Sequence, residues 1–168
     1  TLVQYPIGST RTSYTIPDSV TTIGDYAFHY CTSLTSVTIP DSVTTINKAA
    51  FFACTNLTSI TIPDGTTAIG GYVFSDCTSL TSVTIPDSVT TIGSYAFEDC
   101  TNIKNVFIND VAAWCNITFG GTLSNPLIYG GCLFLNGDKV IDLVITDGVT
   151  KINGYAFSGC SSLTSVTI

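Results

Sequence analysis

The sequence predicts an α/β fold in the form of a right-handed solenoid, in which short parallel strands and short helical or 3-10 turns recur coil after coil. Three observations lead to this prediction. Cysteine, phenylalanine and isoleucine recur at intervals of 23 residues along most of the 168-residue chain. Each unit contains a short alternating segment of β-branched residues, followed by a turn that in most units begins Pro-Asp. Each unit also carries more apolar side chains than it can bury alone, so neighbouring units have to stack.

The 23-residue interval is kept by four residue types. The columns are Cys31, Cys54, Cys77 and Cys100; Phe28, Phe51, Phe74 and Phe97; Ile16, Ile39, Ile62, Ile85 and Ile108; and Pro17, Pro40, Pro63 and Pro86. The interval breaks once, because Phe97 and Phe157 are 60 residues apart and one unit has therefore gained 14 residues. We expect a single domain, divided into a cap-like segment 1–13, regular repeats 14–103, an extended irregular repeat 104–142 and a truncated regular repeat 143–168.

Within one unit the residue order predicts the local structure. Val37-Thr38-Ile39 alternates apolar and polar side chains, which is typical of a short strand. Pro40-Asp41-Ser42 predicts a turn, because proline fixes φ and the aspartate side chain bonds to the backbone that follows. Val43–Ile46 predicts a second extended piece, and Gly24–Phe28 predicts one helical or 3-10 turn. Strands of adjacent coils are expected about 4.8 Å apart in a parallel ladder.

The extended repeat interrupts this pattern and carries the candidate partner-contact residues. Hydroxyl side chains dominate the outward strand positions of the regular units, whereas this unit begins with Lys104, Asn105 and Phe107. The candidates that follow are the aromatic residues Trp114, Phe119, Tyr129 and Phe134. Leu133–Val140, with Asn-Gly at its centre, predicts a β-hairpin closed by a type I′ turn. Insertions in repeat proteins often build a binding face. Large aromatic side chains are mostly buried, however, so packing of these rings against the solenoid is the favoured interpretation.

The seven cysteines first suggest a disulfide framework. Five of them occupy one repeated inward position beside the phenylalanine, namely Cys31, Cys54, Cys77, Cys100 and Cys160. An in-line stack directs such side chains in parallel, so we expect a structural ladder of buried free thiols. Cys115 and Cys132 lie in the extended repeat and are the more favourable pair for a disulfide.

Composition disfavours several classes of function. The net charge is −7 with only five lysine and arginine residues, and a nucleic acid partner would require many cationic contacts to phosphate. No apolar run approaches the roughly 20 residues of a spanning helix, so this segment is not expected to insert into a membrane. A single histidine, with no paired carboxylates and no base beside the serine rows, predicts a protein that is not an enzyme and needs no cofactor.

Aspartate forms a further column at the turn that follows each strand. Its members are Asp18, Asp41, Asp64, Asp87, Asp110 and Asp147. Such a row would offer calcium several carboxylate oxygens. The turn signature favours the simpler interpretation that each aspartate satisfies its own turn. We therefore predict no metal site.

These motifs resemble the 23-residue units of the BspA-like leucine-rich repeat family, surface proteins of anaerobic bacteria that are also expanded in trichomonads. The matching positions of one unit are Leu34, Val37, Ile39, Pro40, Ile46, Ala50, Phe51 and Cys54. The segments Asp110–Asn116, Asn125–Leu127 and Leu133–Gly137 are similar to an extended unit of that family, and Leu2–Ser13 is similar to its N-terminal cap.

The resemblance implies a right-handed leucine-rich-repeat solenoid that is secreted or displayed at the cell surface. Such a module would act in protein binding or adhesion, with a host or extracellular matrix protein, or a glycan, as its partner. The family pattern is structural and assigns no ligand-binding residue. The alternative function is an architectural spacer or stalk that presents another domain.

The sequence ends at Ile168, directly after the last predicted strand. Solenoids normally finish with a polar capping unit, whereas nothing here follows to cover Leu163, Val166 and Ile168. The sequence therefore predicts a fragment of a longer array that self-associates through its uncapped C-terminal end, or frays over the final unit from about Tyr155.

Overall fold

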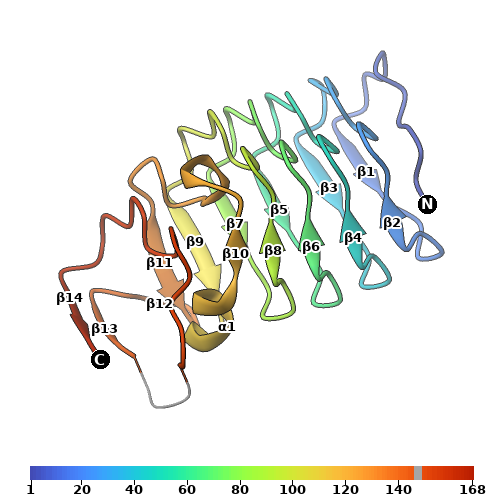
Figure 1. Ribbon diagram of the computed structural model, residues 1–168. Coiled ribbons are helices and arrows are strands. Elements are labelled where there is room, and N and C mark those ends of the chain that lie inside the picture. The colour runs from blue at the N-terminus through green and yellow to red at the C-terminus, as the bar shows by residue number, and fades with distance from the viewer. Residues whose placement is uncertain (146–148) are drawn as a thin grey trace.

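Figure 1 shows a solenoid whose coils stack side by side from the N-terminal to the C-terminal end. This computed structural model describes residues 1–145 and 149–168. One side carries β1 (Ser13–Thr15), β3 (Ser36–Thr38), β5 (Ser59–Thr61), β7 (Ser82–Thr84), β9 (Asn105–Ile108) and β11 (Cys132–Leu135). A second side carries β2 (Thr22–Ile23), β4 (Thr45–Ile46), β6 (Ala68–Ile69), β8 (Thr91–Ile92) and β10 (Thr118–Phe119). Strands of successive coils pair in parallel, which confirms the predicted solenoid.

In the regular coils, strand pairing follows the 23-residue interval of the sequence. Ile60 of β5, for example, pairs with Val83 of β7. Ile60 is buried, whereas Ser59 and Thr61 on either side of it are exposed. The alternation predicted for the strands is therefore present, with the apolar column inside and the hydroxyl columns outside.

The phenylalanine column forms the centre of the core. Phe28, Phe51, Phe74 and Phe97 are fully buried. Their rings stack with centroid distances of 4.9 Å, 5.6 Å and 5.3 Å along the column. Tyr5 continues the column at the N-terminal end, with its ring 5.3 Å from that of Phe28. One continuous aromatic stack thus runs through the regular coils.

The turn segment of each regular coil is not helical, and this part of the prediction is wrong. Tyr26 and Tyr30 have left-handed backbone conformations, with φ of 57° and 55°. A right-handed helix cannot continue through such residues. Instead, the N–H of Tyr26 donates to the carbonyl of Lys48 at 3.0 Å, and that of Phe28 donates to Ala50 at 2.7 Å. The turn side is therefore a third ladder of backbone hydrogen bonds between coils.

The extended repeat contains the helices of the described residues. Helix α1 (Val111–Asn116) begins at Asp110, whose Oδ1 accepts a hydrogen bond from the N–H of Ala113 at 2.7 Å. A short 3-10 helix, η1 (Thr122–Ser124), follows β10. Neither helix is long enough, or apolar enough, to span a membrane.

The predicted hairpin is present and interrupts the strand side. Strands β11 and β12 (Asp138–Lys139) pair antiparallel. Asn136 and Gly137 between them have φ of 52° and 92°, as a type I′ turn requires. Because β12 occupies the free edge of β11, the following strand, β13 (Asp142–Val144), pairs with β14 (Ser165–Thr167) in a separate sheet.

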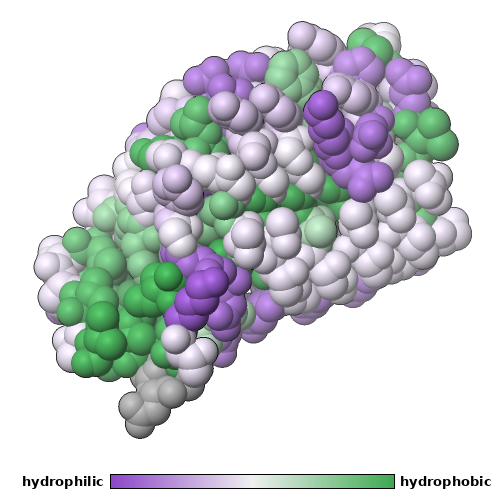
Figure 2. Space-filling view, viewed as in Figure 1, coloured by the Kyte–Doolittle hydropathy of each residue, from purple (hydrophilic) through white to green (hydrophobic). Residues whose placement is uncertain are grey.

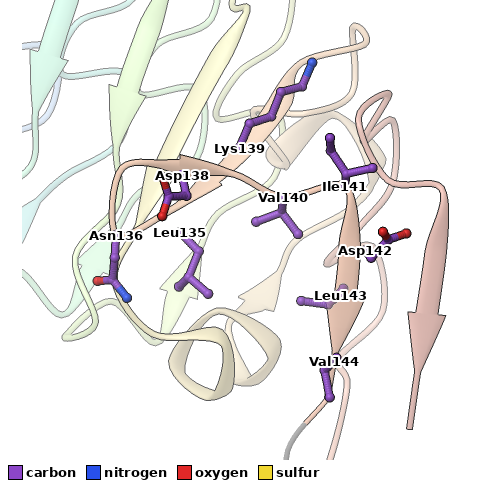
Figure 3. A pocket seen from close by; sticks show the side chains of 9 residues that line it. All are labelled: Leu135, Asn136, Asp138, Lys139, Val140, Ile141, Asp142, Leu143 and Val144. Atoms are coloured by element: carbon purple, nitrogen blue, oxygen red, sulfur yellow. The ribbon is translucent and has the colours of Figure 1, made fainter.

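A groove of about 550 Å³ lies at this interruption, between the hairpin and β13. Figure 3 shows Leu135, Val140 and Leu143 directed into the space, whereas Lys139 points away from it. Hydrophobic surface also gathers at the C-terminal end of the solenoid (Figure 2). Val166 is 46 % exposed and Ile168 is 93 % exposed, so the last strand leaves apolar side chains in contact with water.

Candidate binding surface

Hydroxyl side chains cover the strand side of the first coils, and the structure gives many of them a local role. The Oγ1 of Thr35 donates to the carbonyl of Thr12 at 3.0 Å. Thr58 and Thr81 repeat this contact with the preceding coil, at 3.2 Å and 3.1 Å. These threonines stabilise the stacking of the coils, so their recurrence requires no ligand.

At β9 and β11 the side chains on the strand side differ from those of the preceding coils. Asn105 and Phe107 pair with Ser82 and Thr84 of β7, so an amide and an aromatic ring replace two hydroxyl side chains. Phe134 of β11 pairs with Phe107, and their ring centroids are 5.0 Å apart. Both rings are partly exposed, and Lys104 beside them is exposed. We call these four residues, Lys104, Asn105, Phe107 and Phe134, the β9–β11 surface.

Trp114 and Phe119 lie apart from this surface and are buried. They are only 1 % and 7 % exposed, and their rings pack edge to face at 5.4 Å. The Nε1–H of Trp114 donates to the carbonyl of Ala156 in the last coil at 2.9 Å. Asn125, also buried, donates to the same carbonyl at 3.0 Å. These side chains join the extended repeat to the coil that follows it.

Tyr129 is partly buried, and its hydroxyl oxygen accepts a hydrogen bond from the backbone N–H of Asp99 at 2.8 Å. Burial raises the pKa of Tyr129, because the phenolate form loses solvation. Asp99 has a left-handed backbone, with φ of 56°. Tyr129 therefore stabilises the turn side of the fourth regular coil and lies apart from the β9–β11 surface.

With this geometry in place, comparison with known proteins identifies the repeat. The family described as the BspA type leucine-rich repeat region matches the chain in six copies, over residues 8–124 and 129–168. The chain belongs to this family. The resemblance inferred from the 23-residue columns is thereby confirmed. A search among curated proteins gave no match.

Solved structures of leucine-rich repeat proteins resemble this chain along most of its length. A protein from Eubacterium ventriosum is 26 % identical with a TM-score of 0.62, and the match covers 98 % of this chain and 35 % of that one. The T. pallidum protein TpLRR is 30 % identical with a TM-score of 0.56, covering 93 % and 56 %. The pneumococcal vaccine antigen PcpA, at 16 % identity and a TM-score of 0.54, shares the fold, with coverage of 98 % and 43 %. The chain thus spans about a third to just over a half of these structures.

The repeated cysteines of this leucine-rich repeat chain form a ladder of thiols at four positions. Cys31, Cys54, Cys77 and Cys100 are buried, whereas Cys160 is partly exposed. The thiol of Cys54 donates to the carbonyl of Phe28 in the preceding coil at 3.1 Å. The thiols of Cys77 and Cys100 do the same toward Phe51 and Phe74, at 3.2 Å and 2.9 Å. Cys160 makes no such contact and instead lies 3.5 Å from the Oγ of Ser162.

Burial also suppresses the reactivity of these thiols. It raises the pKa of Cys31 to about 11 and those of Cys54 and Cys100 to about 12, and it raises the pKa of Cys77 strongly. The nucleophilic form is the thiolate, which is therefore disfavoured at all four positions. The pairing considered for Cys115 and Cys132 is not present, because both are free thiols in this structure.

The aspartate column does not come together as a metal site in the part of the chain that the structure describes. Asp110 caps helix α1, and Asp147 lies outside the described residues. The other four aspartates stand at the turns that follow the strands, as their Pro-Asp order predicts.

A row of exposed tyrosines on the turn side was missed by the sequence interpretation. Tyr26, Tyr95 and Tyr155 are 42 % to 48 % exposed, and Tyr72 lies between the first two. The signal was available, since tyrosine stands two residues before the core phenylalanine in each of these coils. The second regular coil breaks the row with Ala49.

Proposed function

We propose that this chain is a non-enzymatic binding module of a secreted or cell-surface protein, and that it contacts a protein partner through the β9–β11 surface. The observation that carries the proposal is the Phe107–Phe134 pair. It places two partly exposed rings, 5.0 Å apart, on a side where the preceding coils present hydroxyl groups. Aromatic side chains are enriched in interface hot spots because they bury much apolar area with little loss of rotamer freedom.

The polar members of the surface fit the same role. Lys104 is exposed beside the rings, and Asn105 is partly exposed. An apolar centre with polar side chains beside it is the usual composition of a protein interface. Lys104 offers an acidic side chain of the partner a local ion pair beside the rings.

Family membership supports a binding role without chemistry and a location outside the cell. The alternative function, a spacer or stalk, is supported by the uniform hydroxyl rows along β3, β5 and β7. These rows stabilise the stacking of the coils and form a flat surface without protruding side chains. The two functions differ in one measurable respect, because a spacer has no saturable binding that depends on Phe107.

We expect Phe107→Thr to weaken binding of a partner by at least about tenfold, since truncation of a hot-spot aromatic side chain costs about 2 kcal/mol. Threonine is the residue at the equivalent position of the regular coils, so the substitution restores the repeat and leaves the fold intact. The measurement is binding of the purified chain to a panel of purified extracellular matrix proteins and glycans. Thr61→Ala, at the equivalent exposed position of β5, is the matched control.

Saturable binding of a matrix protein that Phe107→Thr weakens and Thr61→Ala leaves unchanged supports the proposal. Binding that survives Phe107→Thr, or no saturable binding to any member of the panel, contradicts it and favours the spacer. Binding of a glycan alone, lost in Phe107→Thr, keeps the surface but overturns the assignment of a protein partner.

We also propose that the isolated chain self-associates through its C-terminal strand, because Val144, Val166 and Ile168 expose apolar area beside an unpaired strand edge. The expected result is an average molecular mass that rises with concentration in light scattering. Val166→Lys should keep the chain monomeric by adding charge at this edge, whereas the control Thr61→Lys should not. A wild-type chain that stays monomeric over the whole range would refute this proposal.

A further inference from the structure

The turn side carries a slot where one tyrosine of the exposed row is absent. Tyr26, Tyr72 and Tyr95 hold equivalent positions in the first, third and fourth regular coils, and Ala49 holds that position in the second. A pocket of about 300 Å³ at this position is lined by Tyr26, Lys48, Ala49, Phe52 and Tyr72, and Ala49 at its base is only 2 % exposed. It is separate from the β9–β11 surface, which lies on the strand side of other coils.

The geometry of the row sets what fits this slot. Tyr72 and Tyr95, in adjacent coils, stack with centroids 4.9 Å apart and an angle of 16° between their planes. Tyr26 and Tyr72 are two coils apart, which places them roughly 10 Å from one another. That separation is about twice a stacking distance, which matches the thickness of one planar ring between two others. Ala49 and Phe52 supply the apolar remainder of the lining.

The ammonium group of Lys48 beside the slot favours some planar rings as ligands over others. The Nζ of Lys48 lies over the Tyr72 ring, 6.0 Å from its centre, and a ring that stacks on Tyr72 from the slot has to displace it sideways. The equivalent positions in the other coils are Asp25, Gly71, Ser94 and Gly154, so lysine is specific to the coil that has the slot. A ring bound between the tyrosines would bring a substituent close to this ammonium group, where a carboxylate is favoured.

We propose that this slot binds an aromatic ring that carries a carboxylate, as at a C-terminal tyrosine or phenylalanine of a peptide. Tyr26 and Tyr72 sandwich the ring, and Lys48 pairs with the carboxylate. Asp25, in the preceding coil, opposes the anion and keeps the affinity modest. A pyranose sugar also stacks on tyrosine, but it gains nothing from Lys48, so the observations favour the aromatic carboxylate.

The test is a titration of the folded chain with 4-hydroxyphenylacetate, followed by NMR of the tyrosine ring protons. We expect a saturable shift confined to a few tyrosines. Tyramine, which has the same ring with a cation, should bind at least about tenfold more weakly, and acetate alone should not produce the shift. Lys48→Gln should weaken 4-hydroxyphenylacetate about fivefold, whereas the matched control Lys151→Gln should leave it unchanged. Asp25→Asn should strengthen binding about twofold.

Ala49→Tyr is the decisive variant, because it completes the row and fills the slot. Ala49 has φ of 53°, close to the 57° to 60° of Tyr26, Tyr72 and Tyr95, so the backbone accepts the substitution. Because Ala49 is only 2 % exposed, the new ring has to push aside the side chains that line the pocket with it. We expect binding to be lost while the unfolding transition is retained. Unchanged binding in Ala49→Tyr, equal affinity for tyramine, or no saturable shift with the wild-type chain overturns the proposal. Saturation by methyl glucoside with no response to 4-hydroxyphenylacetate does so too. If Ala49→Tyr does not fold, the Lys48 variant and the tyramine comparison decide.

Discussion

Replacing Phe74 by alanine is expected to lower the free energy of unfolding by about 3–5 kcal/mol. Its ring is fully buried in the middle of the column, 5.6 Å from Phe51 and 5.3 Å from Phe97. Truncation removes the transfer free energy of the ring and leaves a cavity that two stacked neighbours cannot close by relaxation. Denaturant unfolding, monitored by circular dichroism, measures the loss.

The matched control is Thr81→Ala on the outward side of the same solenoid. Thr81 is exposed and its hydroxyl makes one hydrogen bond to the carbonyl of Thr58. We expect a change within about 0.5 kcal/mol, as for an ordinary surface substitution. Similar losses for Phe74→Ala and Thr81→Ala would contradict the assignment of inner and outer positions.

Raising the pH from 8 to 10 is expected to remove about 4 kcal/mol of stability through three thiols of the cysteine ladder. In the unfolded chain a thiol ionises around its ordinary pKa of 9.0, whereas burial holds the pKa of Cys54 and Cys100 near 12 and that of Cys77 well above 9.0. The unfolded state therefore binds fewer protons than the native state above pH 9. The contribution of the ladder is fully present below that pH and decreases as the pH rises.

The measurement is denaturant unfolding at pH 8, 9 and 10 under reducing conditions, for the wild-type chain and for Cys77→Ala. The variant should lose about 1.4 kcal/mol less than the wild type over this range, because one titrating thiol is gone. The two chains differ only at position 77, so the contributions of all other groups cancel in the comparison. Identical pH profiles would show that Cys77 is not held as the thiol in the native state.

The sequence was sufficient for features that depend on recurrence. The 23-residue columns placed the strands, the inner and outer faces, the thiols and the hairpin, because each of these follows from periodicity or from a local turn signature. The aromatic pair of the β9–β11 surface was also visible, since Phe107 departs from the hydroxyl column at its position.

Features that depend on contacts between coils were not accessible in the same way. The sequence of Gly24–Phe28 predicts a helical turn. In the structure the backbone of Tyr26 is left-handed, and its N–H donates a hydrogen bond to the carbonyl of Lys48 in the next coil. Burial of Trp114 could be expected from the size of its ring, but its partner could not, because the carbonyl of Ala156 lies 42 residues further on. The slot at Ala49 required knowing that the tyrosines of separate coils stand in a row.

The bonds between coils have a consequence for how such a protein changes in evolution. In the regular coils they join equivalent positions, as when the hydroxyl of Thr81 bonds to the carbonyl of Thr58. Loss of residues 58–80 would connect Leu57 directly to Thr81, the same Leu-Thr junction that Leu34 and Thr35 already form. Recombination between repeats in the gene therefore changes the number of coils, and so the length of the solenoid, while equivalent positions still meet between neighbouring coils. The extended repeat cannot be exchanged in this way. Trp114 and Asn125 bond to Ala156 in the coil that follows, so they require that particular coil as their neighbour and fix the order of the coils around them.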